Sequence, residues 1–495
     1  MKTIISHKSP LSIVFFILLS SCSPDFLDKT PYQVSSAQIQ IENLVLGLYY
    51  ETFAQGAEIN TYFEDFGQKG VDISTDLMSG DMGFSATPNP PFRGIYQFAY
   101  QTRTGRNSQI IWNYYYKLIR NANEILDIIG NDTEIPDDES LKIPFGQAKT
   151  IRAFAYFYLA NLFQHPYGDN PDALCVPVYT TALREEYKAQ STVKEVYAQI
   201  IRDLEDAATA LEGYDRGTGK YQIDQNVALA YLAYAYMQRG ETGDYQKAAD
   251  AAGTVIDSGK FPLMTADEMI KSGFNSVTLK SWIWAMDITA ENAPAQGVYS
   301  FWSNIDYFTY GYVSRGNIKI IDADLYASIP ETDIRKQQFG APVTGEIGAA
   351  PLTPVYKFYD SKRISGGDAL YTNDLLYIRA EEMVLIKAEA LARLGNLSES
   401  LNSLNSLISL RNPAATLENL SQEDLLEQIW FNWRVECWGE GKTYFAMKRY
   451  KKTMHRSDAE GNHNYMAGKD FPYNYERMIF EIPEYEWVNN PNLIP

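Results

Sequence analysis

Aromatic side chains gather in one stretch of the chain that lacks helical periodicity. Trp282 and Trp284 stand two residues apart, and more rings follow, with Asn304 and Asp306 between them. The candidate binding rings in this stretch are Trp282, Trp284, Tyr299, Trp302, Tyr307, Tyr310 and Tyr312. Flat rings stack on the apolar faces of sugars, while amide and carboxylate groups bind hydroxyls. The stretch therefore predicts a carbohydrate-binding surface.

The same residues are also compatible with a purely structural role. The alternation Trp282-x-Trp284 is typical of one face of a strand packed on helices. For Trp302 and the tyrosines after it, core packing and ligand binding remain equally open at this stage. An earlier segment interrupted by Gly and Pro adds Met78, Phe92 and Arg93 as further ligand-binding candidates.

Catalytic and metal-binding patterns are missing from the sequence. Of the four histidines, only three follow residue 22, and no Cys/His spacing typical of a zinc site occurs. Carboxylate pairs such as Asp72 and Asp76 could serve a glycosidase, but they are as well explained by a solvated acidic surface. We predict no catalytic residue, no metal site and no cofactor.

The charge balance narrows the choice of partners. The 495 residues contain 43 Lys plus Arg and 62 Asp plus Glu, which gives a net charge of -19. An acidic chain repels phosphate backbones, so nucleic acid is not an expected ligand.

The N-terminus predicts export and lipid anchoring. Lys2 and Lys8 give the segment before residue 11 a positive charge. An apolar run over 11–19 follows, and it is too short to span a bilayer. The sequence Leu-Ser-Ser-Cys at 19–22 resembles a bacterial lipobox. We therefore expect a lipoprotein signal peptide over 1–21 and acylation of Cys22, whose lipid chains would insert into the membrane. Cys175 and Cys437 are either two buried thiols or one disulfide, and the sequence does not decide between these.

Helical periodicity dominates the rest of the chain. Apolar residues at steps of three and four predict a helix over 107–130, and 147–163 is apolar all round, as in a buried helix. Thr192 and Glu195 form a capping-box pattern at the start of another helix. Further helices are predicted over 38–54, 224–239, 244–258, 375–394, 397–411 and 422–438.

Two predicted helix pairs are alike. Gly243 and Gly395 each stand between two helices, with Asp244 or Asn396 directly after as the expected cap. Such pairs are typical of tetratricopeptide repeats, which must stack to bury their apolar faces. The fold class we predict is mainly α, with tetratricopeptide-like helix pairs forming a scaffold. Long loop-rich insertions, at about 60–106 and 260–372, and a few short strands, at 282–288 and 353–359, complete it.

Several motifs in order are similar to those of the SusD/RagB family of surface nutrient-binding lipoproteins. They are Trp112-Asn113-x-x-Tyr116, Gln147-Ala148-Lys149-x-x-Arg152-Ala153, Tyr167-Gly168-Asp169, Tyr377-x-Arg379-x-x-Glu382, Glu436-x-x-x-Glu440-Gly441 and Ile482-Pro483. The charged members Arg152, Glu382 and Glu389 are best interpreted as buried and paired. Around Glu440 the chain departs from the family pattern, because Asn432 and Trp433 stand where charged residues are usual.

The resemblance implies the function that we expect. Residues 22–495 would form one SusD-like domain, anchored by lipid at the cell outer membrane and exposed at the surface. It would capture an oligosaccharide and deliver it to a SusC-like TonB-dependent transporter, without acting as an enzyme. Capture of peptides or other non-sugar nutrients is the alternative, and an outer-membrane glycoside hydrolase is a remote one.

Overall fold

The fold was analysed in a computed structural model of the chain. The structure describes residues 36–56, 63–85, 91–130, 132–182, 186–296, 300–306, 318–340, 352–364 and 371–494.

The described residues form sixteen α-helices and six short strands. The helices are α1 (Ser36–Glu51), α2 (Gln68–Ser79), α3 (Arg93–Tyr96), α4 (Arg106–Ile129), α5 (Glu139–Phe163), α6 (Val193–Ala210), α7 (Gln225–Arg239), α8 (Asp244–Asp257), α9 (Ala266–Lys271), α10 (Phe301–Ile305), α11 (Ala323–Ser328), α12 (Ala380–Arg393), α13 (Leu397–Arg411), α14 (Gln422–Glu436), α15 (Thr443–Tyr450) and α16 (Glu484–Asn489). The strands are β1 (Met82–Phe84), β2 (Trp282–Met286), β3 (Lys319–Ile321), β4 (Leu375–Arg379), β5 (Met454–His455) and β6 (Asp470–Phe471).

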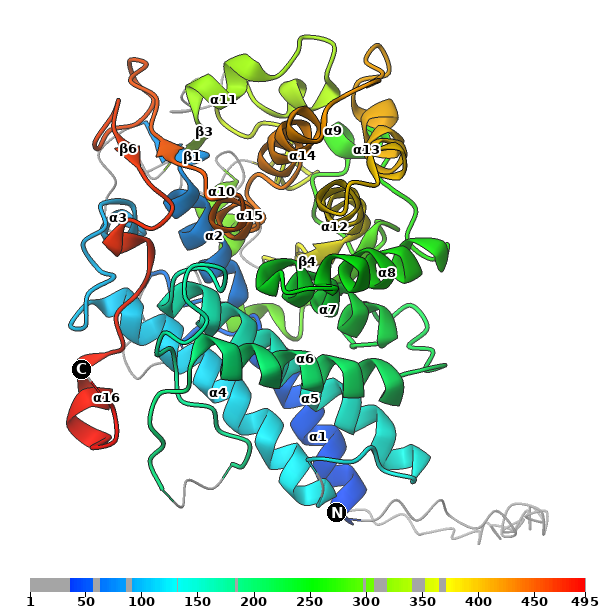
Figure 1. The fold of residues 1–495 in the computed structure, drawn as a ribbon, viewed down its shortest axis with the longest axis vertical. Helices are drawn as coiled ribbons and strands as arrows, with labels where there is room; N and C mark the ends of the chain where they lie inside the picture. The colour runs from blue at the N-terminus through cyan, green and yellow to red at the C-terminus, as the bar shows by residue number, and fades with distance from the viewer. Residues whose placement is uncertain are drawn as a thin grey trace, which may run out of the picture.

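The long helices form a stacked scaffold. In sequence order α4, α5, α6, α7 and α8 each pack on the next, and α12 then packs on α8, α13 and α14. Figure 1 shows this stack running from α4 and α5 at the bottom to α14 at the top. The mainly α, tetratricopeptide-like fold class is thus confirmed, because each helix hairpin buries the apolar face of its neighbour.

Helix α5 packs between α4 and α6 in this stack. It begins at the cap Asp138, whose carboxylate accepts a hydrogen bond from the backbone of Ser140, and every residue from Phe145 to Phe163 is buried. The all-round apolar pattern therefore predicted the right environment, although the helix starts eight residues earlier than the predicted range. Arg152 on α5 is paired with Asp203 and Asp132, at 2.7 Å and 2.5 Å, as expected for a buried charge.

The two helix hairpins that looked alike in sequence adopt the predicted form. The pairs are α7 with α8 and α12 with α13. The caps differ in detail, because Gly243 rather than Asp244 holds the cap position of α8. Asp244 instead accepts a hydrogen bond from the backbone of Glu241 and pairs with Arg239.

Short antiparallel pairs join distant parts of the chain. β1 pairs with β3, β2 with β4, and β5 with β6. The predicted strand at 282–288 is confirmed as β2, but its partner corrects a second prediction, since 375–379 is strand β4 and not the start of the following helix. The predicted strand over 353–359 is wrong, because only an isolated bridge between Thr353 and Gly340 occurs there.

A buried helix replaces the predicted loop after residue 60. All twelve residues of α2 are buried, including Asp72 and Asp76. The interpretation of these two carboxylates as solvated surface is therefore wrong. Gln68 donates to Asp72 at 2.8 Å, and the backbone N–H of Gly441 donates to Asp76 at 3.1 Å. Gly441 has φ +76°, and a Cβ there would meet the α2 backbone, so the Glu440-Gly441 motif needs its glycine for this contact.

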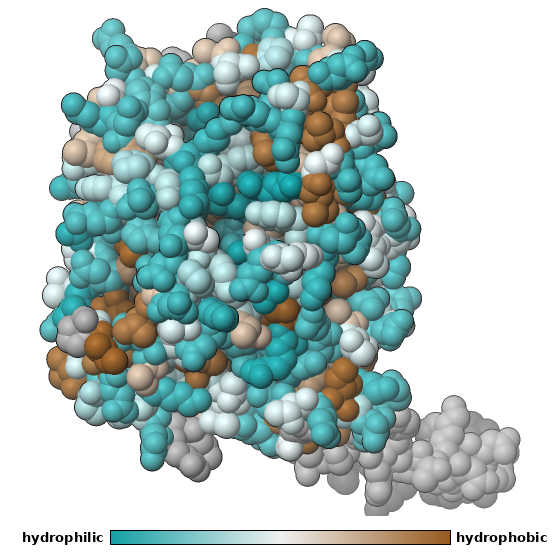
Figure 2. Space-filling model, viewed as in Figure 1, coloured by the Kyte–Doolittle hydropathy of each residue, from teal (hydrophilic) through white to brown (hydrophobic). Residues whose placement is uncertain are grey.

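The face of the molecule seen in Figure 2 is mainly polar. Figure 2 shows a hydrophilic face with small, separated hydrophobic patches. Among the described helices, none has the length and apolar character required to cross a membrane. Cys175 and Cys437 are buried free thiols, which decides the question that the sequence left open.

Candidate functional site

The two tryptophans at 282 and 284 belong to the core. Both are fully buried on β2. Trp284 packs on Phe154 and Tyr377, with ring centres 5.5 Å and 4.7 Å apart, and its indole N–H donates to the carbonyl of Tyr221. The alternation therefore reflects core packing, and these rings offer no face to a ligand in this structure. Met78, also fully buried on α2, is a core residue for the same reason.

Helix α10 buries the next group of candidates. Trp302 is fully buried, and its indole N–H donates to the carbonyl of Asn373 at 3.0 Å. Asn304 accepts a hydrogen bond from Lys319 Nζ at 3.3 Å, and Asp306 accepts one from the backbone N–H of Asp360 at 2.8 Å. Of the two interpretations left open for Trp302, the structure shows core packing, and the candidates Asn304 and Asp306 are also buried rather than exposed at the surface.

Phe92 is also buried and contacts this group through Lys319. Its φ is +64°, and its backbone N–H donates to Glu64 Oε1 at 2.8 Å. Lys319 Nζ lies 5.2 Å from the centre of the Phe92 ring and 5.4 Å from that of Phe84. Burial raises the pKa of Glu64, although Arg106 beside it acts in the opposite direction. Arg93 is exposed next to Phe92.

These contacts, with helix α10 between Asn304 and Asp306, link a set of buried residues that we name the polar seam. The polar seam consists of Glu64, Phe92, Lys319, Asn304, Asp306 and Asp360. Four stretches outside the described residues, 57–62, 86–90, 307–317 and 365–370, are close to its members in the sequence. The structure thus brings together sequence candidates from both loop-rich regions, but as anchors beneath the surface.

One end of the polar seam opens at an exposed tyrosine. Tyr100 is 37% exposed, and the guanidinium carbon of Arg106 lies 4.9 Å from its ring centre. A Cβ on Gly94 would lie only 1.7 Å from the Tyr100 ring, so the ring packs where any larger residue would stand. Beside it, Arg103 lies 4.4 Å from the ring centre of Trp487. We name Tyr100 with Arg106 the first shelf.

The first shelf is tied directly to the seam. Arg106 Nη2 lies 3.0 Å from Glu64 Oε1, so one guanidinium contacts both the buried carboxylate and the exposed ring. The Arg106 side chain is 23% exposed. Because the ion pair with Glu64 already restricts the Arg106 side chain, Arg106 can bind a hydroxyl with little further loss of side-chain freedom.

The other end of the seam opens at a second exposed tyrosine. Tyr356 is 38% exposed and lies edge-on to Tyr359, with ring centres 6.1 Å apart. Arg363 stacks over Tyr359 at 3.9 Å and lies 5.8 Å from Tyr356. The backbone N–H of Arg363 donates to the carbonyl of Asp360, the last member of the seam. We name Tyr356 with Tyr359 and Arg363 the second shelf.

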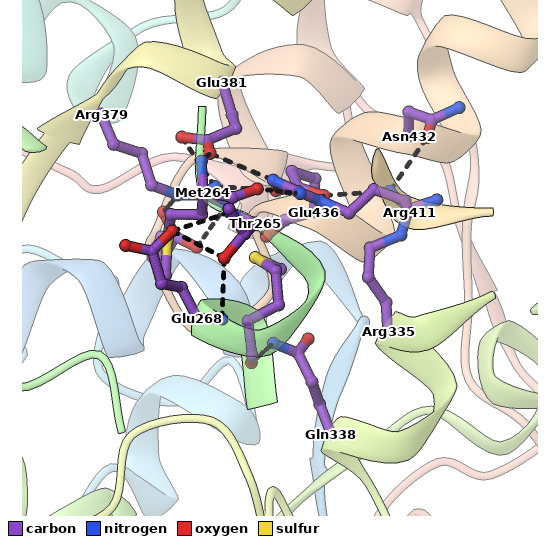
Figure 3. A network of polar contacts seen from close by, with 12 residues as sticks. Met264, Thr265, Glu268, Arg335, Gln338, Arg379, Glu381, Arg411, Asn432 and Glu436 are labelled. Carbon is purple, nitrogen blue, oxygen red and sulfur yellow. Dashed lines mark hydrogen bonds and ion pairs between the residues drawn. The ribbon is translucent and has the colours of Figure 1, made fainter. Parts of the chain in front are cut away.

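A buried network of charges lies next to the seam. Arg379 binds Glu436, Glu440 and Glu381, at 2.7 Å, 2.8 Å and 3.1 Å, and Arg411 binds Glu381 and Glu436. Figure 3 shows these groups converging from separate elements, with Arg335 reaching Glu436 and Asn432. The arginines hold the pKa of Glu436 well below its usual range despite burial.

The cations and carboxylates of this charge network are paired with one another. Lys357 binds Glu440 at 2.8 Å and packs on Phe358, which contacts Trp302 of α10. Four cations and four carboxylates are therefore paired, namely Arg335, Arg379, Arg411 and Lys357 with Asp333, Glu381, Glu436 and Glu440. At the positions where the chain departs from the family pattern, Asn432 accepts a hydrogen bond from Arg335 and the indole N–H of Trp433 donates to Glu389.

Of the three charged motif residues, Arg152 and Glu389 form ion pairs with described residues. Glu389 binds Arg449 and Arg393, at 2.6 Å and 2.9 Å. Glu382 instead accepts hydrogen bonds from the Tyr234 hydroxyl and the backbone of Arg379, and burial raises its pKa. Within the described ranges, no group of three or more His, Cys, Asp or Glu side chains is arranged to hold a metal ion.

Some predicted residues lie outside the described ones. They are Cys22, Tyr299, Tyr307, Tyr310 and Tyr312. The shelf residues Tyr100, Arg106, Tyr356 and Arg363 were not among the sequence candidates. No sequence motif identifies them, because the residues of each shelf meet the seam only in the folded chain.

Comparison with known proteins agrees with this architecture. Residues 25–237 match a SusD-like family described as starch-binding associating with outer membrane, and residues 336–494 match the SusD family. A SusD-like protein of Formosa agariphila is 23% identical over 384 residues, which cover 69% of this chain and 72% of that protein.

Solved structures show the same fold over nearly the whole chain. A SusD-like carbohydrate-binding protein from Bacteroides vulgatus is 27% identical, with a TM-score of 0.78, over 92% of this chain and 97% of that one. A SusD superfamily protein from Bacteroides thetaiotaomicron is 23% identical, with a TM-score of 0.75, over 92% and 99% of the two chains. The stacked helix hairpins and the two family matches together establish that the chain belongs to the SusD/RagB family.

Proposed function

We propose that this protein binds an oligosaccharide at the cell surface and passes it to a SusC-like TonB-dependent transporter without cleaving it. The observation that carries the proposal is the pair of shelves, in which an exposed tyrosine and an arginine stand together at each end of the polar seam. Such rings stack on sugar faces, and guanidinium groups donate to hydroxyls.

Family membership supports the same function. The similar protein of Bacteroides vulgatus is described as carbohydrate-binding, and one family description refers to starch and to the outer membrane. Anchoring through acylated Cys22 would keep the protein beside its transporter, and residues 22–495 would act as one domain. The tyrosines at 299, 307, 310 and 312 remain candidate ligand contacts.

Binding without turnover fits the chemistry of the described residues. The carboxylates of the seam are engaged by backbone N–H groups and Arg106. A glycosidase needs an acid and a second carboxylate free to act on the sugar. Incubation with the bound oligosaccharide should therefore yield no shorter products.

The test combines a glycan screen with calorimetry on matched variants. Tyr100→Ala and Tyr356→Ala should each lower glycan affinity about tenfold, since one ring contact contributes about 1–1.5 kcal/mol. Tyr187→Ala is the control, because Tyr187 is exposed to a similar extent, 42%, and belongs to neither shelf. No glycan binding, or equal affinity in all three variants, would overturn the proposal. Tight peptide binding in its place would favour the peptide alternative.

Delivery is tested separately from binding. The protein purified in mild detergent from its native membrane should bring a large barrel transporter with it. A Cys22→Ala variant should lose membrane attachment while keeping glycan affinity. Purification without any barrel protein would contradict the delivery step.

A further inference from the structure

A groove near the α7–α8 hairpin is lined by several basic side chains. It has a volume of about 560 Å³ and lies between the α6–α7 connection, the residues after α8 and the segment leading into β2. We name it the basic groove; the residues that matter are Arg216, Lys220, Lys260, Phe261, Lys280 and Asp287. It shares no lining residue with the polar seam or either shelf.

Three lysines of the basic groove have no carboxylate partner among the described residues. Lys220 is half-buried, and its ammonium donates to the carbonyl of Leu279. Lys260 and Lys280 are exposed at the rim. Burial, with help from Arg216, lowers the pKa of Lys220 to about 8. A bound anion would offset the free-energy cost of burying the charged Lys220 ammonium.

Most of the nearby acidic groups are already engaged. Asp224 caps α7 by accepting from the backbone of Val227, and it also lies 3.3 Å from Arg216 Nε. Asp215 accepts from the backbone N–H of Gly217 at 2.9 Å. Asp287 is the remaining lining carboxylate and lies exposed at the rim. The groove therefore has an excess of positive charge, in a chain whose net charge is -19.

The groove also offers an apolar wall. Phe261 is half-buried, and the guanidinium carbon of Arg216 lies 5.9 Å from its ring centre. Val277 and the hydroxyl of Thr278 complete this side. A ring, hydroxyls and ammonium groups together fit a ligand that is both cyclic and anionic.

We propose that the basic groove binds an anionic saccharide through its carboxylate or sulfate groups. The proposal rests on the proposed function and adds the class of ligand and a second place of contact. Charges far from the groove are screened beyond about 8 Å at physiological salt, so the local lysines dominate over the acidic surface. Sulfate and carboxylate sugars share this chemistry, and the test distinguishes them.

The test measures three probes of similar length: an oligogalacturonate, a chondroitin sulfate hexasaccharide and a neutral malto-oligosaccharide. At least one anionic probe should bind, with an affinity that falls as salt rises. The combined variant Lys220→Gln, Lys260→Gln and Lys280→Gln should weaken that probe at least tenfold. The control variant Lys194→Gln, Lys387→Gln and Lys469→Gln removes the same charge elsewhere and should change affinity less than twofold.

A gain of affinity provides a test that misfolding cannot imitate. Asp287→Asn removes the rim carboxylate and should tighten the anionic probe severalfold. Whichever anionic probe responds to these changes identifies the source of the charge as carboxylate or sulfate. Neutral-probe affinity should remain unchanged in all three variants.

The outcomes separate this inference from the proposed function. Anionic binding that is equal in the groove variant and its control overturns the inference and leaves glycan capture intact. Binding of the neutral probe without binding of either anionic probe also overturns the inference and leaves glycan capture intact. Failure of all saccharides to bind overturns both.

Discussion

Lys319 donates a hydrogen bond to the side chain of Asn304, 3.3 Å away, although its ammonium group is fully buried. The surrounding groups are the rings of Phe84 and Phe92, and the nearest charge that favours its proton is that of Glu64. Burial lowers the pKa of Lys319 to about 7. The polar seam is therefore held by an amine that loses its proton near neutrality.

Lys319→Met should change how stability depends on pH. In the unfolded chain the lysine keeps its proton up to about pH 10.4, while in the folded chain it loses it near 7. Between these values the unfolded state binds more protons, so the stability contributed by this site rises with pH. The methionine variant should be more stable than the wild type below about pH 7, and this advantage should shrink towards pH 10.

Urea denaturation of both proteins at several pH values measures this difference. The change across the whole window should be no more than about 5 kcal/mol, at 1.36 kcal/mol per pKa unit. A difference between the two proteins that stays constant from pH 6 to pH 10 would contradict a buried, neutralised amine.

Gly94→Ala should displace the first shelf without unfolding the protein. The added Cβ would lie 1.7 Å from the ring of Tyr100, so the ring must move. We expect glycan affinity to fall about as much as in Tyr100→Ala, with cooperative thermal unfolding retained. Gly47→Ala is the control, because nothing lies within 4 Å of its added Cβ. Full glycan affinity in Gly94→Ala would show that the ring position is unimportant.

Arg379→Met should break the buried charge network. It removes the partner of Glu436 and Glu440 while keeping most of the side-chain volume. Loss of one partner from a buried network costs about 3–5 kcal/mol, because the remaining charges stay desolvated. Arg477→Met, at an exposed pair with Glu481, should cost less than about 1 kcal/mol. Equal unfolding midpoints for the two variants in urea would refute the structural role of the network.

The two thiols should resist modification in the folded protein. Burial raises the pKa of Cys175 to about 12, and it raises the pKa of Cys437 as well. Iodoacetamide should therefore label neither residue under native conditions and both after denaturation, as measured by peptide mass spectrometry. A disulfide-linked peptide containing both residues would contradict the structure.

The long helices could be predicted because their apolar periodicity is local. The range 107–130 differs from α4 by one residue at each end. Helix α2 was missed since its buried face includes Gln68, Lys69 and Asp72, which satisfy one another only after folding. The sequence predicts helix over strand β4 because all five of its residues are buried and show no polar–apolar alternation. Only the pairing with β2 identifies the segment as a strand.

The candidate site was predicted only in part. The sequence pointed to two loop-rich segments, but it could not tell that Trp302 and Phe92 are buried, since exposure depends on what packs above a residue. Tyr100 and Tyr356 are 256 positions apart in sequence, and their common connection to the seam appears only through Glu64, Lys319 and Asp360.

The most direct test of glycan capture is a crystal structure of the protein with the oligosaccharide found in the screen. We predict a sugar ring in contact with Tyr100 or Tyr356 and a hydroxyl within hydrogen-bond distance of Arg106 or Arg363. An oligosaccharide bound elsewhere, with both tyrosines still in contact with solvent, would contradict the account.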